Sequence, residues 1–288
     1  MKLKANKTIL GLALAIGALF SIALLANNLK VPSQEALDYI GEPSFSYFEK
    51  SLQNLPENKI VHSALKIPIF IYHSVRPYIN GESQIQDDFD VTPELLERQL
   101  SYLKDNGYAT ITLDQFVADI ENGTTGKINK PVMLTFDDGW RNQYKYAFPL
   151  LKKYGLKATF YVYTNPIDHH KEHFLTWDEI KEMDEAGMTI GSHTVTHPYL
   201  SNLPQEALRR EIALSKQILE KELGKPVLHF ASPFGYIDPQ IMQIVKDARY
   251  KTARTTYKGI YHTKDDLLQL RGILVGDNFN DFVKVLNR

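Results

Sequence analysis

Short apolar runs alternate with longer segments of helical periodicity along most of the chain after residue 66. Each run is continuous and ends at a turn residue or a polar residue, which is typical of a strand buried on both faces. The predicted strands are Ile67–Tyr72, Ala109–Thr112, Val132–Phe136, Ala158–Tyr163, Met188–Gly191 and Val227–Ala231. The predicted helices between them are 92–107, 113–120, 143–154, 176–187 and 204–223. Strands that alternate with helices predict an α/β domain with a parallel sheet.

The helix boundaries carry signals of their own. Thr92 precedes Pro93, which is the pattern of an N-cap followed by proline at the first helical position. Thr176 and Glu179 have the spacing of a capping box. Gly155 follows the predicted helix at 143–154 and is suited to ending it.

The N-terminus has the pattern of a membrane anchor. Lysines precede an apolar or small run from Ile9 to Ala26, and positive charge on the leading side predicts that the rest of the chain is exported. Leu24 occupies a position where signal peptidase requires a small residue, so we expect an uncleaved signal anchor over 1–26, with a cleaved signal peptide as the alternative. A spacer is predicted at 27–65 and the folded domain at 66–288.

Composition limits the function. The chain of 288 residues is 43% hydrophobic, has a formal net charge of −1 and contains no cysteine. A near-neutral chain without a basic patch is not expected to bind nucleic acid. The absence of cysteine excludes disulfides and a thiol nucleophile.

Five candidate site residues fall just after predicted strands. They are His73, Asp137, Asp138, His193 and Phe234. In parallel α/β folds the loops at the carboxyl ends of the strands converge and carry the chemistry. We therefore expect these residues to meet in one site.

Three of the residues at the strand ends have the chemistry of a metal site. Asp138, His193 and His197 would supply one carboxylate oxygen and two imidazole nitrogens and leave positions open, as in a catalytic zinc site. Pro198 disfavours helical geometry at His197, so a turn is expected there. A metal lowers the pKa of bound water, and Asp137, adjacent to a ligand, is placed to accept its proton. The alternative is a solvated Asp-Asp-Gly turn with separate histidines.

The segments Thr135–Gly139 and His193–His197 resemble, in order and separation, the first two motifs of the polysaccharide deacetylases, the NodB-homology enzymes of carbohydrate esterase family 4. The stretch from Leu175 to Pro198 is also similar, and the resemblance covers about Ile67 to Leu286. It implies a distorted (β/α) barrel with fewer than eight repeats, a divalent metal that is usually zinc, Asp137 as base, and Asp138, His193 and His197 as metal ligands.

The third motif departs from the family pattern Arg-x-Pro-Tyr. Here the matching residues are Ala231–Gly235, without the arginine that steers the base. The backbone N–H of Phe234 can still form the oxyanion hole, because a main-chain donor does not depend on the side chain. We expect Arg271 to orient Asp137 instead, the alternative being an ordinary surface arginine.

The family's general acid has no visible counterpart. His73 and His262 are the candidates, although a lone histidine in a loop is more often solvated. Tyr199 and Tyr236 are candidates for stacking on sugar rings, with partly buried packing as the alternative. The C-terminal stretch from Leu267 to Val275 resembles the branch that acts on poly-β-1,6-N-acetylglucosamine.

These observations predict an exported, membrane-tethered, metal-dependent N-deacetylase of N-acetylglucosamine polymers. We expect it to act on the biofilm polymer poly-β-1,6-N-acetylglucosamine as a monomer, without binding nucleic acid. The alternatives are a peptidoglycan N-acetylglucosamine deacetylase and a catalytically silent glycan-binding protein on the same fold.

Overall fold

A parallel sheet of eight strands forms the centre of the fold in a computed structural model, which describes residues 64–79, 89–122 and 128–288. In spatial order the strands are β10 (Thr252–Arg254), β9 (His229–Ala231), β8 (Thr189–Ser192), β7 (Thr159–Val162), β6 (Pro131–Phe136), β2 (Ile69–Tyr72) and β12 (Ile273–Leu274), with β5 (Ala109–Thr110) beside β6. All pairs within this sheet are parallel. The six strands expected from the apolar runs are confirmed.

An aromatic stack lies across the middle of the sheet. Tyr72 and Phe136 occupy paired positions on β2 and β6, and Phe136 pairs with Phe160 on β7. Their ring centroids are 4.9 and 4.8 Å apart, and all three side chains are fully buried. Burying one such ring contributes about 1.5–3 kcal/mol. The stack fixes the strand ends immediately below His73 and Asp137.

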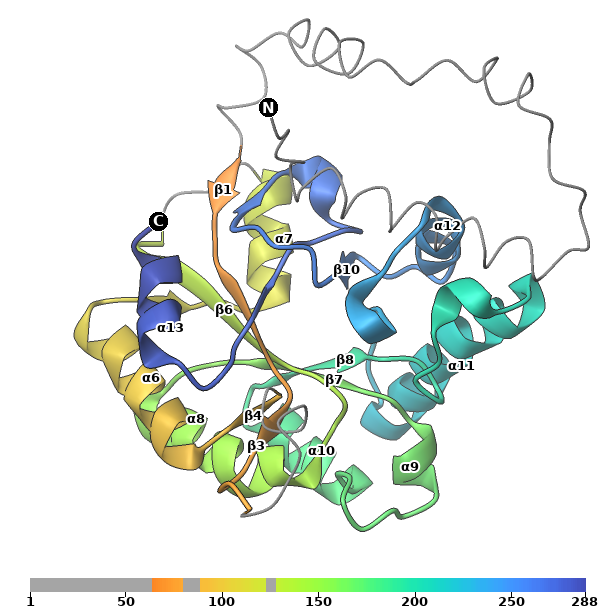
Figure 1. The fold of residues 1–288 in the computed structure, drawn as a ribbon. Helices are drawn as coiled ribbons and strands as arrows, with labels where there is room; N and C mark the ends of the chain where they lie inside the picture. The colour runs from red at the N-terminus through yellow and green to blue at the C-terminus, as the bar shows by residue number, and fades with distance from the viewer. Residues whose placement is uncertain (1–63, 80–88, 123–127) are drawn as a thin grey trace, which may run out of the picture. The chain divides into compact units, whose positions relative to one another are not determined.

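Helices surround the sheet in Figure 1. They are α6 (Pro93–Asp105), α7 (Leu113–Asn122), α8 (Phe148–Tyr154), α9 (Asn165–Asp168), α10 (Trp177–Glu185), α11 (Gln205–Leu223), α12 (Pro239–Asp247) and α13 (Phe279–Leu286), with 3-10 turns η2 (Leu200–Asn202), η3 (Pro233–Gly235) and η4 (Lys264–Asp266). The expected caps are confirmed: the Thr92 hydroxyl accepts from the Leu95 N–H, and Thr176 and Glu179 form a complete capping box.

The helix predicted for 143–154 is confirmed in its extent and in its end at Gly155, but its first half is not α-helical. The segment begins as a π-helix, η1 (Gln143–Ala147), and becomes α-helical from Phe148. Pro149 lacks an N–H, so an α-helical bond at that position cannot form. The Phe148 N–H instead bonds to the Gln143 carbonyl, five residues back. This wider turn directs Gln143 into the protein, where it is fully buried.

The chain around β12 joins the two ends of the sheet. Before β12, the Leu270 N–H donates to the Ala253 carbonyl of β10 at 2.8 Å, and after β12 the Val275 N–H donates to the Ile71 carbonyl of β2 at 2.9 Å. The result is a curled, barrel-like sheet, which confirms the distorted (β/α) barrel at the level of its strands. The elements after β9 were not predicted from the pattern of the sequence.

Two short pairs of strands complete the described fold. β1 (Leu65–Lys66) is antiparallel to β11 (Tyr261–His262), and β3 (Ser74–Val75) is parallel to β4 (Asp90–Val91). No helix within the described ranges is both long and apolar enough to cross a membrane. The anchor predicted for 1–26 and nearly all of the spacer predicted for 27–65 lie outside the described residues.

Candidate active site

Asp138, His193 and His197 converge at the carboxyl ends of β6 and β8. Asp138 Oδ1 lies 3.6 Å from His193 Nε2 and 3.3 Å from His197 Nε2, and one donor atom from each residue lies within 4.8 Å of the others. Ligands about 2.0–2.1 Å from a tetrahedral zinc lie roughly 3.3 Å apart. The separations and the donor atoms therefore fit a small divalent cation such as zinc.

The remaining polar atoms of two of these residues are already engaged. His193 Nδ1 lies 2.7 Å from the Ala231 carbonyl, which fixes its Nδ1–H tautomer and leaves the Nε2 lone pair free. Trp140 Nε1 donates to Asp138 Oδ2 at 3.0 Å and leaves Oδ1 free. Burial lowers the pKa of His193 to about 4, so its imidazole is neutral at pH 7 and able to bind a metal.

Helix α11 holds the loop between the two histidines. Glu211 Oε2 accepts from the N–H groups of Val195 and Thr196, each at 2.9 Å, and its Oε1 accepts from the Thr196 hydroxyl at 2.8 Å. Thr194 Oγ1 accepts from the His197 N–H at 3.0 Å. The turn expected at His197 is confirmed, and the sequence did not reveal the role of Glu211.

Backbone strain is concentrated around this site. Asp138, Thr194, His197 and Phe234 have φ values of 73°, 73°, 58° and 59°. A non-glycine residue in this region costs of order 1–3 kcal/mol and persists where the surroundings hold it. Three of these residues, Asp138, His197 and Phe234, line one cavity, and Thr194 is buried in the loop that carries His197, which indicates a site whose geometry is fixed in advance.

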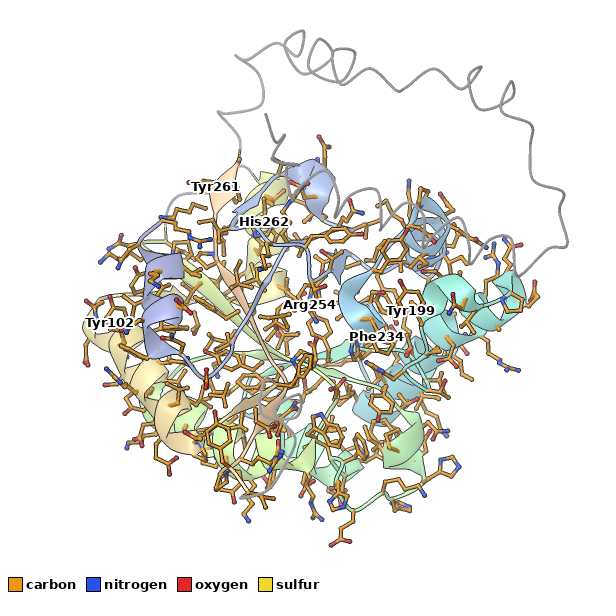
Figure 2. All side chains as sticks on the ribbon, viewed as in Figure 1. Tyr102, Tyr199, Phe234, Arg254, Tyr261 and His262 are labelled. Carbon is orange, nitrogen blue, oxygen red and sulfur yellow. The ribbon has the colours of Figure 1, made fainter. Side chains whose placement is uncertain are left out.

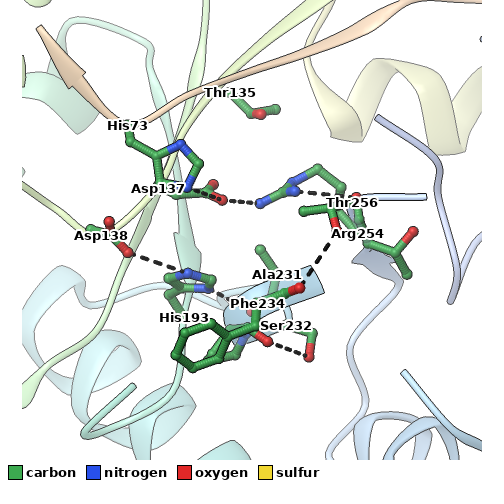
Figure 3. A network of polar contacts seen from close by, with 12 residues as sticks. His73, Thr135, Asp137, Asp138, His193, Ala231, Ser232, Phe234, Arg254 and Thr256 are labelled. Atoms are coloured by element: carbon green, nitrogen blue, oxygen red, sulfur yellow. Dashed lines mark hydrogen bonds and ion pairs between the residues drawn. The ribbon is translucent and has the colours of Figure 1, made fainter. Parts of the chain in front are cut away.

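Asp137 is buried next to the three candidate ligands. Figure 3 shows its carboxylate between His73 and Arg254. Oδ2 accepts a hydrogen bond from Arg254 Nη2 and lies 3.9 Å from His73 Nε2, whereas Oδ1 has no hydrogen-bond partner among the described residues. Burial by itself raises the pKa of Asp137, but Arg254, with His193 and His73, holds it below its ordinary value. The carboxylate is therefore charged at neutral pH, with one oxygen free to accept a proton.

The arginine expected to orient the base is corrected from Arg271 to Arg254. Arg254 is 1% exposed at the end of β10, and its guanidinium contacts Asp137. Arg271 is exposed, and its side chain packs against Gly259. The sequence carries only an indirect signal for Arg254: the Asp238-Pro239 pattern predicts a helix start before it, but the short strand that ends on this arginine has no pattern of its own.

The two acid candidates separate in the structure. His73 lies beside Asp137 and lines the cavity described below, whereas His262 is not among the described residues that line it. His262 is fully buried on β11, with Nε2 3.0 Å from the Ile67 carbonyl, and Figure 2 shows it well apart from Phe234. Burial lowers its pKa to about 4. His262 is thus a structural residue, and the prediction of an acid there is corrected.

Exposed aromatic rings form a row that begins at the metal-type cluster. The ring centroids of His197 and Phe234 are 5.0 Å apart, those of Phe234 and Tyr199 5.7 Å, and those of Tyr199 and Tyr236 6.4 Å. Phe234, Tyr199 and Tyr236 are 61, 43 and 39% exposed. Tyr199 and Tyr236 stack on each other, with an interplanar angle of 15°, and each keeps more than a third of its surface exposed.

A large open cavity lies over the metal-type cluster and Asp137 and reaches Phe234, whereas Tyr199 and Tyr236 lie outside its lining. Its volume is about 1690 Å³, and its lining includes His73, Asp137, Asp138, His197 and Phe234. Sites for small molecules usually measure about 300–1,000 Å³. The cavity has room for a ligand larger than a single small molecule.

Comparison with known proteins identifies the family. A family model for polysaccharide deacetylase matches residues 124–253. The solved structure of the deacetylase PplD of Streptococcus pyogenes, in complex with acetate, is 31% identical, with a TM-score of 0.73, and the match covers 78% of this chain and 99% of that one.

Two curated relatives bear more specific names. A peptidoglycan-N-acetylglucosamine deacetylase of Bacillus cereus is 34% identical over 43% of this chain, which spans only 55% of that relative's length. A poly-beta-1,6-N-acetyl-D-glucosamine N-deacetylase of Staphylococcus epidermidis is 27% identical over 74% of this chain and 80% of its own length. With the near-complete match to PplD, these findings show that the chain belongs to the polysaccharide deacetylase family, carbohydrate esterase family 4, whose members are hydrolases acting on carbon–nitrogen bonds.

Proposed function

We propose that this protein removes acetyl groups from N-acetylglucosamine units of an extracellular polysaccharide. The polysaccharide that we propose is poly-β-1,6-N-acetylglucosamine. The observation that carries the proposal is the juxtaposition of a metal-type cluster with a buried, charged Asp137 that has one unpartnered oxygen. A bound cation beside a carboxylate base is an arrangement for activating water against an acyl carbon.

Asp138, His193 and His197 would hold a divalent metal, for which their donor set favours zinc. When bound, such a metal lowers the pKa of water and polarises a carbonyl. Asp137 accepts the proton of the attacking water at Oδ1, while Arg254 keeps the carboxylate oriented through Oδ2. The backbone N–H of Phe234 is the donor proposed for the developing oxyanion. His73, next to Asp137, remains the candidate acid for the departing amine.

The size of the cavity and the aromatic row support a polymeric substrate. Aromatic faces that stay exposed next to a polar site are suited to the apolar faces of sugar rings. Tyr199 and Tyr236 are the residues proposed to bind them. The Staphylococcus epidermidis relative matches over 80% of its length, which favours the β-1,6-linked polymer.

Peptidoglycan is the second candidate substrate, because the Bacillus cereus relative is the more identical of the two at 34%. A silent glycan-binding protein is the weaker alternative. The third motif lacks the arginine of the family pattern, which would favour a silent protein, but Arg254 bonds to Asp137, so the base keeps a guanidinium partner.

Acetate release from defined oligomers tests the proposal. The compact unit 60–288 is incubated with β-1,6-linked and β-1,4-linked N-acetylglucosamine oligomers, with chelator and with added zinc. We expect release that chelator abolishes and zinc restores, and that falls about 10²- to 10⁴-fold in Asp137→Asn. Asp247→Asn, at an exposed carboxylate paired with Arg209, is the matched control and keeps full activity. No release from either oligomer by zinc-loaded protein contradicts the proposal.

The proposal places the enzymatic domain outside the cytoplasmic membrane, tethered by residues 1–26, and rests on the basic and then apolar N-terminal pattern. Deleting 1–26 should leave the protein in the cytoplasm. N-terminal sequencing of the full-length product distinguishes an intact anchor from a cleaved signal peptide. A full-length protein found in the cytoplasm would contradict this part of the proposal.

A further inference from the structure

The bonds between β2 and β6 end at the catalytic base. Strands β2 and β6 pair as far as Tyr72 and Phe136, and the last bond runs from the Asp137 N–H to the Tyr72 carbonyl at 2.9 Å. His73 lies just beyond this bond, with Nε2 3.9 Å from Asp137 Oδ2. The backbone carbonyls of His73 and Asp137 are therefore left for another part of the chain to bind.

A buried glutamine connects the two carbonyls. Gln143 is fully buried, and its Nε2 donates to the carbonyl oxygens of His73 and Asp137 at 2.7 and 2.5 Å. A glutamine amide carries two N–H groups, so each carbonyl receives one. Gln143 is the first residue of the π-helix η1, and π-turns of this kind are frequent at functional sites.

The preceding residue extends the same connection. Asn142 Oδ1 accepts from the Val75 N–H at 3.1 Å, and Asn142 Nδ2 donates to the Ser74 hydroxyl at 2.8 Å. Two consecutive amides thus hold the segment His73–Val75 against the loop that follows β6. The four hydrogen bonds involve both edges of Asn142 and both donors of Gln143.

We propose that Asn142 and Gln143 are positioning residues, an amide clamp that holds His73 beside Asp137 in the geometry needed for proton transfer. The effect on catalysis rests on the proposed deacetylation. A purely structural role would be to satisfy buried carbonyls, as many buried amides do. The two roles predict different effects of substitution. Loss of a clamp lowers kcat and leaves substrate binding and metal binding unchanged, whereas loss of a purely structural contact lowers stability.

Gln143→Met is the decisive variant, since it keeps the length of the side chain and removes both donors. Measured on the β-1,6-linked oligomer, kcat should fall about 10- to 100-fold, because a displacement of about 1 Å at a reacting group costs up to about 10²-fold. KM should stay within about twofold of the wild type, as expected when an interaction acts only in the transition state. Zinc affinity, measured by chelator competition, should stay within about threefold.

Gln99→Met is the matched control. Gln99 is also a fully buried glutamine, on α6, and its Oε1 accepts from the Tyr72 hydroxyl at 2.9 Å, away from the two carbonyls. We expect its melting temperature to fall while kcat stays within about twofold. Retention of kcat in Gln143→Met, or equal losses of kcat in the two variants, would overturn the clamp.

Asn142→Ala decides the question if Gln143→Met does not fold, because Asn142 is only partly buried. It breaks the outer half of the clamp and should lower kcat about 3- to 10-fold at unchanged KM; an unchanged kcat would overturn the proposal. If the wild type releases no acetate from any glycan, the proposed function fails, and a crystal structure of Gln143→Met still tests the clamp. A His73–Asp137 separation unchanged from the wild type would then refute it.

Discussion

Arg254 determines how Asp137 behaves as an acid. Its guanidinium bonds to the carboxylate, both side chains are at most 4% exposed, and the pair lowers the pKa that burial alone would raise. Arg254→Met should therefore move the pKa of Asp137 upward and shift the acid limb of the kcat/KM pH profile to higher pH. Breaking a buried ion pair costs about 3–5 kcal/mol at neutral pH.

The ion pair between Arg254 and Asp137 should also make the stability of the fold depend on pH. A carboxyl whose folded pKa is depressed contributes stability above its unfolded pKa, and loses it as the pH falls through the folded value. The difference in unfolding free energy between wild type and Arg254→Met should therefore narrow at acid pH. Arg271→Met, at an exposed arginine, serves as the control and should alter neither property. An acid limb that stays in place in Arg254→Met would contradict the assignment.

His262 provides a second pH dependence, outside the site. Burial lowers its pKa to about 4, whereas an unfolded histidine titrates near 6.5. The unfolded chain therefore binds the additional proton between these values, and His262 destabilises the fold as the pH falls through that window. The change in unfolding free energy caused by His262→Gln should be more stabilising at pH 4.5 than at pH 7, by about 2–3 kcal/mol. Urea unfolding at the two pH values measures this, and equal effects at both would exclude the shift.

Residue chemistry was predictable where it was local in the sequence. Asp137, Asp138, His193 and His197 stand in two short motifs directly after strands, and the structure brings them together. Arg254 was not found, because it reaches Asp137 from 117 positions away, through a strand that the apolar pattern did not reveal. An arginine at any neighbouring strand end can bond to the carboxylate, and the sequence alone does not say which strand supplies it.

At the scale of elements, helix α11 supports the loop of the metal-type site through Glu211. Glu211 accepts three hydrogen bonds from the loop that carries His197. Glu211→Ala removes all three and leaves a strained loop unsupported, so zinc affinity should weaken about 10- to 100-fold, as is typical when a partner of metal ligands is lost. Glu222→Ala, on the same helix and paired with Lys181, should leave zinc affinity unchanged. Equal affinities for the two variants in a chelator competition would refute this role of Glu211.

Elements were predictable where periodicity and caps agreed. The strands β2, β5, β6, β7, β8 and β9 and the helices opened by Thr92 and Thr176 match the apolar runs and capping patterns. The π-helix at Gln143 was missed, because its register depends on Pro149 and on tertiary hydrogen bonds that periodicity does not record. The short strands β10 and β12, two or three residues long, lack enough sequence for a pattern.

At the scale of the whole molecule, loops from both halves of the curled sheet line one cavity. Its volume of about 1690 Å³ exceeds what a single sugar needs, and the exposed rings of Phe234, Tyr199 and Tyr236 extend from the metal-type cluster. Phe89, 46% exposed, also lines the cavity and contacts the ring of His73. A polymer that crosses the site would therefore gain binding energy from sugars beyond the reacting unit, including those over Tyr199 and Tyr236. The fold alone does not specify this, because the same barrel supports any arrangement of rim residues.

The dependence of activity on oligomer length tests this arrangement. In the wild type, kcat/KM should rise as sugars are added until the aromatic row is covered. Tyr199→Ala and Tyr236→Ala should each lower kcat/KM on long oligomers about 5- to 100-fold, since stacking on one ring contributes about 1–3 kcal/mol by analogy with base stacking. The loss should be smaller on short oligomers, which do not reach these rings. Tyr261→Ala, at a tyrosine 54% exposed on β11, removes an equally large ring elsewhere and should change neither value. If the tyrosine variants lost the same factor at every length, the rings would be supporting the catalytic loop rather than binding sugar.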